Sequence, residues 1–416
     1  MKYYLCAFGL LFSASIFASD FTEDSINLVF KSVKNGNAAK LKEQSSANDA
    51  YGYFSKAGYY RINGQLDVST NAADKCIASL SAGDIKAKAA CQLIKAGNYL
   101  MVGSYMQWAG AMADMRAYSA ALSGIPDLNQ IYLTYPKFLR DSFTAGTIVE
   151  EIEREGVENV NNKYGIPLVR LKVGNTLNSE RSANVDLVID LGSSYSILNK
   201  KIVDFLGVKT VLGFQPIIKS GKEVGSYNLI GPLTLEINGV RLRNIYMADT
   251  DVEFNILGRD LLRLLGPSKL TQDKFSRVSD QEFASLCKSR GVITSEPSGG
   301  WASVRVPAVI GPRPVLIKVE TGSNSPLQAD GMDLRNFGKD KFESYVHVSP
   351  WSRGAVQYVR GVAEVKTTWG SAKTEFFGTS LPTTFHPWKI GFANQAEFSW
   401  DIGKNLVCFS TNPLIQ

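Results

Sequence analysis

Two short stretches decide the fold: Val188-Ile189-Asp190-Leu191-Gly192-Ser193 and Val319-Glu320-Thr321-Gly322-Ser323. In each, apolar residues lead into an acid, and a Gly-Ser pair follows one residue later. Glycine permits a tight turn that exposes the carboxylate at a strand end, and hydroxyl groups hold its orientation. We therefore expect Asp190 and Glu320 to be two catalytic acids. Their active-site turns would comprise Leu191, Gly192 and Ser193 in one copy and Thr321, Gly322 and Ser323 in the other.

The sequence around the first acid recurs farther along the chain. Asn255-Ile-Leu-Gly258 corresponds to Trp388-Lys-Ile-Gly391, and Leu270-Thr-Gln-Asp273 corresponds to Phe398-Ser-Trp-Asp401. The offsets are 130 residues from Asp190 to Glu320, 133 from Gly258 to Gly391 and 128 from Asp273 to Asp401. Ordered matches at a nearly constant offset predict an internal repeat. Gly258 and Gly391 are expected to support the acid turns by letting the backbone pass closely behind them.

These motifs resemble those of the pepsin and retropepsin superfamily of aspartic proteases. That family carries an apolar-apolar-Asp-Thr/Ser-Gly-Ser/Thr turn and a later apolar-apolar-Gly turn in each lobe, and the resemblance extends from Ile166 to Phe409. It implies two facing β lobes whose carboxylates lie about 3 Å apart and share one proton. One acid would activate water for peptide hydrolysis while the other donates to the carbonyl oxygen. No metal or other cofactor is required.

The chain departs from that pattern at two positions. Leu191 stands where the family has a hydroxyl residue that braces the paired turns, and Glu320 stands where the family has Asp. The extra methylene of Glu320 displaces its carboxylate by about 1.5 Å. A misplacement of about 1 Å can cost about a hundredfold in rate.

Two functions therefore stay open at the level of sequence. One is an aspartic endopeptidase that uses the Asp190/Glu320 pair. The other is an inactive pseudoprotease that binds an extended peptide or protein partner in the interlobe cleft by strand addition. A homodimer that pairs Asp190 with its symmetry mate is disfavoured, because the second lobe should already occupy that face. We therefore expect a monomer.

Composition and strand pattern predict an α+β protein that begins with an α-helical domain, and the resemblance implies that two all-β aspartic-protease-like lobes follow it. The 416 residues suit two or three domains. Residues 20–160 are rich in Ala, Lys, Leu and Met, which favours helices. The lobes are expected at 166–278 and 301–416, joined by a helix and linker at 279–300. The helical domain should pack beside the lobes; a propeptide that fills the cleft is the rival interpretation.

Two hairpins are expected in the first lobe. Asn238-Gly239 lies between two alternating runs and predicts a tight turn, because both residues tolerate positive φ. Residues 214–227, with Gly221 and Gly225, are a candidate for the flap that covers the cleft in the resembling family. An ordinary exposed hairpin explains that segment equally well.

Residues 1–19 have the layout of a secretory signal peptide, with Lys2 ahead of the apolar run from Leu5 to Phe17. A membrane anchor needs about 18 or more apolar residues, so no membrane span is expected in the mature chain. We expect export to the periplasm or secretion. Disulfides persist in such compartments.

Four cysteines follow the leader, an even number that suits disulfides in an exported protein. Cys76 and Cys91 lie in the helical region on either side of a short turn, so we expect them to pair. Cys287 would then pair with Cys408. No CxxC spacing or HxxxH pair supports a metal site.

The charge excludes one class of partner. The formal net charge is +6, but no run of Lys and Arg interleaved with aromatic residues is present. Nucleic-acid binding depends on such basic surfaces. We therefore expect a peptide or protein partner and no nucleic acid.

Overall fold

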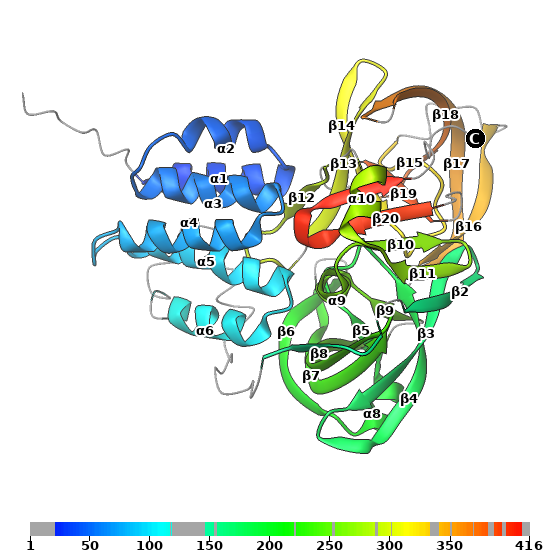
Figure 1. Cartoon of the computed structure of the whole chain (residues 1–416). Helices are drawn as coiled ribbons and strands as arrows, with labels where there is room; N and C mark the ends of the chain where they lie inside the picture. The colour runs from blue at the N-terminus through cyan, green and yellow to red at the C-terminus, as the bar shows by residue number, and fades with distance from the viewer. Residues whose placement is uncertain are drawn as a thin grey trace, which may run out of the picture.

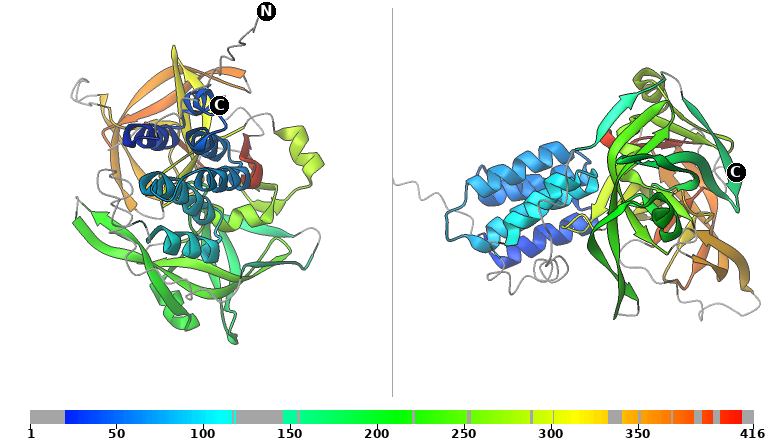
Figure 2. Two further views of the ribbon diagram at one scale, coloured as in Figure 1. Left: turned by 90° about the vertical axis from the view of Figure 1, so that its left-hand side faces the viewer. Right: turned by 90° about the horizontal axis from the view of Figure 1, so that it is seen from below.

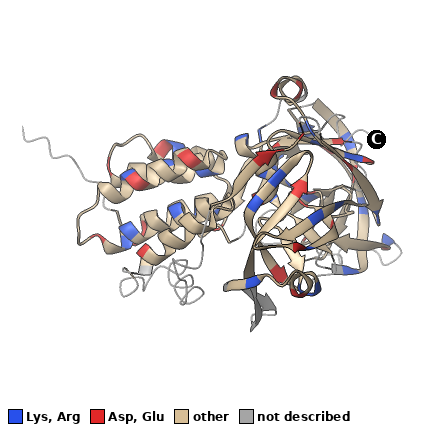
Figure 3. Ribbon diagram, turned by 60° about the horizontal axis from the view of Figure 1, so that its bottom comes forward, with Lys and Arg blue, Asp and Glu red and all other residues tan. Residues whose placement is uncertain are grey.

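The computed structural model describes residues 21–116, 118, 146–153, 156–219, 222–251, 254–287, 290–300, 302–332, 341–349, 352–368, 370–381, 387–392 and 397–409. The predicted signal peptide, residues 1–19, lies outside these ranges. A helical part comes first and a strand-rich part follows, which confirms the α+β class (Figure 1). Residues of both charge signs are spread over both parts (Figure 3). Within the described ranges, no helix is long and apolar enough to cross a membrane.

Six helices form the N-terminal layer in the described residues. They are α1 (Glu23–Asn35), α2 (Ala38–Gln44), α3 (Ala50–Ile62), α4 (Leu66–Ala78), α5 (Ile85–Met101) and α6 (Tyr105–Arg116). Local sequence sets their ends: the Thr22 hydroxyl accepts a hydrogen bond from the N–H of Ser25 at the start of α1. Gly36, at φ 67°, ends the same helix in the left-handed conformation that glycine tolerates. The helices stack to one side of the strands (Figure 2).

The first sheet holds the strands around Asp190. Its path runs β21-β20-β10-β11-β2-β3-β4-β9-β5-β8-β7-β6, and β1 pairs with β8. The elements before the linker are β1 (Ile148–Glu151), β2 (Val157–Lys163), β3 (Ile166–Asn175), β4 (Asn178–Ile189), β5 (Ile197–Asn199), α8 (Lys200–Leu206), β6 (Lys209–Lys219), β7 (Lys222–Ile237), β8 (Val240–Thr250), β9 (Asn255–Leu257), α9 (Arg259–Leu262), η3 (Arg263–Leu265), β10 (Ser268–Thr271), β11 (Lys274–Arg277) and α10 (Asp280–Leu286).

Two details of this sheet bear on the sequence predictions. The turn between β7 and β8 is the expected Asn238-Gly239 turn, with φ of 49° and 71°. Strand β1 and the first residues of β2, by contrast, lie inside the range 20–160 that was expected to be helical, so the strands begin before that expected boundary. Their side chains are mostly exposed, so they form strands because β8, β3 and β11 supply the hydrogen-bonding partners.

The second sheet holds the strands around Glu320. Its order is β12-β13-β14-β19-β15-β18-β17-β16. The elements are β12 (Val292–Ser295), β13 (Ala302–Ile310), β14 (Arg313–Glu320), β15 (Gln328–Ala329), β16 (Glu343–Ser349), β17 (Ser352–Thr367), β18 (Gly370–Thr379), β19 (Trp388–Gly391), β20 (Glu397–Asp401), η6 (Ile402–Lys404) and β21 (Leu406–Phe409). Strand β20 pairs with β10, so the last strands of the chain join the first sheet.

Both expected disulfides are present. Cys76 and Cys91 join α4 to α5 with a Cα–Cα distance of 6.3 Å. Cys287 and Cys408 join the end of α10 to β21 with a Cα–Cα distance of 5.1 Å. The second bridge ties the connection between the two sheets to the final strand.

A buried arginine fastens the helices to the segment that links the sheets. Arg61 on α3 is fully buried. Its Nη1 donates to the carbonyl of Pro297 at 2.7 Å and its Nη2 to that of Glu296 at 3.0 Å. Nearby, a Cβ atom at Gly97 would lie 2.2 Å from the Pro297 oxygen, so α5 approaches this segment as closely as glycine allows.

Replacing Arg61 with Met should therefore destabilise the protein. The two carbonyls would lose a charged donor, which costs about 3 kcal/mol of unfolding free energy. Urea titration of the full chain measures this loss. Arg170→Met is the matched control, because the Arg170 side chain is 71% exposed and its ion pair with Asp186 contributes no more than about 1 kcal/mol. Equal losses of unfolding free energy in the two variants would contradict a stabilising role for the hydrogen bonds of Arg61.

Candidate active site

The structure brings the two predicted acid turns together. Asp190 directly follows β4, and Glu320 is the last residue of β14. A Cβ atom at Gly322 would lie 2.6 Å from Cγ of Asp190, and one at Gly192 would lie 3.3 Å from Cγ of Glu320. Each glycine thus lies against the acid of the opposite turn. Asp190 is 6% exposed and the Glu320 side chain 21% exposed.

One hydroxyl group joins the turns. The Oγ1 atom of Thr321 accepts the N–H of Leu191 at 2.9 Å and donates to the carbonyl of Ile189 at 2.9 Å. All of these groups are buried, so each bond is made away from competing water. Leu191 has no hydroxyl to return the contact, and its side chain is fully buried in the apolar core. The brace between the turns is therefore one-sided.

Each acid-bearing strand has a short parallel neighbour. Ile189 on β4 is aligned with Leu257 on β9, and Glu320 on β14 is aligned with Gly391 on β19. Beyond each pair the backbone makes an equivalent hydrogen bond. The N–H of Arg259 donates to Ser193 O at 3.0 Å, and the N–H of Phe392 donates to Ser323 O at 2.7 Å.

The two supporting glycines lie where these neighbours pass the acid turns. A Cβ atom at Gly258 would lie 2.3 Å from the carbonyl oxygen of Tyr195. One at Gly391 would lie 2.3 Å from the carbonyl oxygen of Ser323. Side chains at either position would push the passing strand away from its acid turn.

The surroundings move the pKa values of the two acids in opposite directions. Burial raises the pKa of Asp190, and the negative charge of Glu320 raises it further. Burial also raises the pKa of Glu320, but Lys318, Lys389 and His347 outweigh it and lower that pKa to about 2. Asp190 is therefore the acid of the pair that holds its proton more tightly, and Glu320 is the one that ionises more readily.

Lys318 is the residue at this site that the motif search missed. Its Nζ lies 2.5 Å from Oε1 of Glu320. Successive side chains of a strand point to opposite faces of the sheet, so Lys318, two residues before Glu320, lies on the same face as Glu320. The aligned position in the first copy is Val188, so comparing the two copies position by position would have exposed this lysine. Lys389 on β19 lies opposite Lys318 in the register of the two parallel strands. The Nζ of Lys389 lies 2.9 Å from Oδ2 of Asp330.

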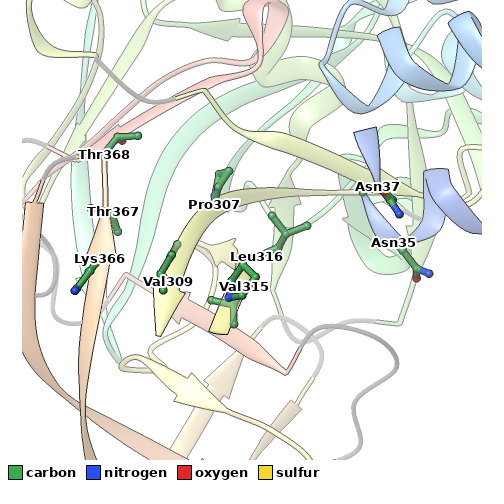
Figure 4. A pocket seen from close by; sticks show the side chains of 12 residues that line it. Asn35, Asn37, Pro307, Val309, Val315, Leu316, Lys366, Thr367 and Thr368 are labelled. Atoms are coloured by element: carbon green, nitrogen blue, oxygen red, sulfur yellow. The ribbon is translucent and has the colours of Figure 1, made fainter. Parts of the chain in front are cut away.

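A surface pocket of about 840 Å³ has no residue of the acid turns in its lining, and Figure 4 shows its lining side chains. It opens between the end of α1 and the strands β13, β14 and β17. Its lining is Asn35, Gly36, Asn37, Pro307, Ala308, Val309, Pro314, Val315, Leu316, Lys366, Thr367 and Thr368. This lining is largely apolar and contains no acid, so it offers no catalytic group.

Two other predictions concern features near the site. The candidate flap, residues 214–227, falls on the β6–β7 hairpin, but its side chains lie outside what the structure describes, so the flap stays a prediction.

In the described part of the chain, no cluster of three or more His, Cys, Asp or Glu residues is arranged to hold a metal ion.

The likeness of this chain to known proteins comes from solved structures. No family model matches the chain, and no curated protein matches it. Among solved structures, the chain is similar to a retropepsin-like aspartic protease from Rickettsia conorii, with 15% identity and a TM-score of 0.21. The match covers 32% of this chain and 95% of that one. A TM-score of 0.21 does not establish a shared fold, so membership of the family stays a prediction from the motifs.

Replacing Thr321 with Val should loosen the paired turns. The buried N–H of Leu191 and the buried carbonyl of Ile189 would both lose their partner, at a cost of about 2 kcal/mol in unfolding free energy. Thr321→Ser keeps the hydroxyl and should retain most of the stability. Urea titration of both variants checks this, and a loss in Thr321→Val no larger than the loss in Thr321→Ser would contradict the role of the hydroxyl.

The low pKa of Glu320 makes a pH-dependent contribution to stability. A carboxylate whose pKa is lowered by folding stabilises the protein above its unfolded pKa, and that contribution disappears as the pH falls toward the folded value of about 2. Glu320→Gln should therefore cost on the order of 2 kcal/mol near neutral pH and progressively less between about pH 5 and pH 2. Denaturant titrations across that range measure the difference. A constant difference would rule out an ionic origin.

Proposed function

We propose that this chain binds extended peptides between its two β lobes at the Asp190/Glu320 site, and that the site does not hydrolyse them. The ion pair between Lys318 and Glu320 carries this proposal. Peptide recognition by strand addition requires main-chain groups and pockets for alternate side chains, and it requires no reactive acid. The lobes are proposed at 166–278 and 301–416, as related copies with equivalent parallel strand pairs behind each acid.

Hydrolysis demands more of the two acids than closeness. A water molecule must be activated by one carboxylate while the pair holds a single proton. A carboxylate neutralised by an ammonium group at 2.5 Å is a weak base, as its pKa of about 2 indicates. The one-sided brace at Leu191 further reduces the precision with which the acids are held.

An aspartic endopeptidase is the second candidate function. It is supported by the opposite shifts of the two pKa values, since the pKa is raised for Asp190 and lowered for Glu320. A protonated Asp190 beside an ionised Glu320 is the charge state that general acid–base catalysis by a carboxyl pair uses. In that case Asp190 would donate to the peptide carbonyl and Glu320 would take a proton from water. The weak basicity of Glu320 makes this route slow.

The mature chain is proposed to be an exported monomer. Two disulfides are compatible with an oxidising compartment.

Removing the ammonium group tests which candidate is correct. The wild-type full mature chain should bind fluorescent peptides from an extended-peptide library without cleaving them at acid or neutral pH. Lys318→Met should return the pKa of Glu320 toward its usual range. Combined with Glu320→Asp, it should yield pepstatin-sensitive cleavage at acid pH, at least about tenfold above the Asp190→Ala background.

Lys366→Met is the matched control, because the Lys366 side chain is 54% exposed and its ion pair is with Glu364. It should leave binding unchanged and bring no cleavage. If the wild type cleaves peptides and Asp190→Ala abolishes that cleavage, the proposal of a non-hydrolysing binding site is wrong and the endopeptidase is correct. Absence of both binding and cleavage in every variant would overturn both candidates.

A further inference from the structure

Strand β16 forms hydrogen bonds directly to the acid turn of the second lobe. The N–H of Asn324, four residues after Glu320, donates to the carbonyl of Val348 at 3.2 Å. In return, the N–H of Val348 donates to Oδ1 of Asn324 at 2.9 Å. Nδ2 of Asn324 donates to the carbonyl of Val346 at 3.0 Å. The main-chain N–H and the side-chain amide of Asn324 are therefore already satisfied by a strand of this chain.

The same strand inserts a side chain against the first lobe. Val348 is 2% exposed and belongs to a small apolar cluster with Ile166, Leu168 and Val188. Val188 lies two residues before Asp190 on β4 and is fully buried. Because side chains alternate along a strand, this position borders the acid on the same face.

Contacts on either side of Val348 fix the hairpin at this place. Nδ1 of His347 lies 3.3 Å from Oγ of Ser325, and the charge of His347 helps to lower the pKa of Glu320. On the next strand, the guanidinium carbon of Arg353 lies 4.7 Å from the ring centre of Tyr164, in the turn between β2 and β3. The β16–β17 hairpin thus reaches both lobes.

We propose that β16 occupies its own chain's peptide site, with Val348 in the position of a bound peptide's side chain beside Asp190. This inference rests on the proposed function, since it names what fills the peptide site when no peptide is bound. A peptide added at the acid turns would need the N–H of Asn324 and the apolar surface at Val188, and β16 uses both. The hairpin must leave the site before a peptide binds. The apparent affinity for peptide is therefore the intrinsic affinity multiplied by the fraction of molecules in which the hairpin has left.

Val346 provides a matched control on the same strand. It has the same side chain as Val348, lies two residues away and is 54% exposed. Val348→Ser should weaken the docking of β16 because it removes buried apolar surface. Val346→Ser changes the same residue type by the same atoms and should leave the docking intact.

Thiol labelling measures the docking without any peptide. In the full mature chain, Val188→Cys places a thiol beneath Val348, while the four native cysteines are held in disulfides. We expect labelling by a small thiol reagent to be at least about tenfold faster with Val348→Ser than with Val346→Ser. Asn324→Ala removes the side-chain hydrogen bonds from the other partner and should act in the same direction if Val348→Ser does not fold. Equal labelling rates in all backgrounds would overturn the proposal.

Peptide binding separates this inference from the proposed function. Val348→Ser should bind library peptides about tenfold more tightly than the wild type, and Val346→Ser should bind like the wild type. Equal affinities in all three proteins would refute occupation by β16 while leaving the proposed function in place. Faster labelling with no peptide binding in any variant would refute the proposed function while supporting occupation by β16.

Discussion

The hydroxyl of Thr321 is the contact on which the arrangement of this molecule depends. It bridges the N–H of Leu191 and the carbonyl of Ile189, and so joins the end of the first acid-bearing strand to the turn of the second. The two sheets meet here over a common apolar core that includes Leu191 and Val319. Because both bonds are buried, the separation of the turns is fixed to within hydrogen-bonding distance.

Given that contact, electrostatics decide what the paired acids can do. The turns bring the two carboxyl groups close together, and the negative charge of Glu320 disfavours ionisation of Asp190. Families with a symmetric carboxyl pair relieve this with a shared proton. Here the relief comes from an ammonium group, since Lys318 pairs with Glu320 and Asp190 is left as the acid with the raised pKa. The asymmetry favours a binding site over a catalytic one.

The helical part is connected to the same framework. Tyr105 on α6 donates its hydroxyl hydrogen to Oδ2 of Asp260 at 3.1 Å, and Ser196 donates to Oδ1 of Asp260 at 2.7 Å. The Ser196 hydroxyl in turn accepts the N–H of Gly258, behind the first acid turn, at 2.9 Å. Burial raises the pKa of Asp260, which is 1% exposed, so its hydrogen bonds are costly to lose. The helices therefore support the first acid turn as well as the linker that Arg61 clamps.

The sequence by itself determined the features that depend on local pattern. Glycine and an acid after an apolar strand located both turns, Asn238-Gly239 located a hairpin, and cysteine parity with local placement gave both disulfides. Tertiary structure alone decided the contacts that depend on which distant strands become neighbours. The exposed strands β1 and β2 exist because of their partners, β20 joins the first sheet through β10, and Val348 reaches Val188 through the β16–β17 hairpin. Such pairings join residues far apart in the chain, and the alternation within a single strand does not specify which strand will lie beside it.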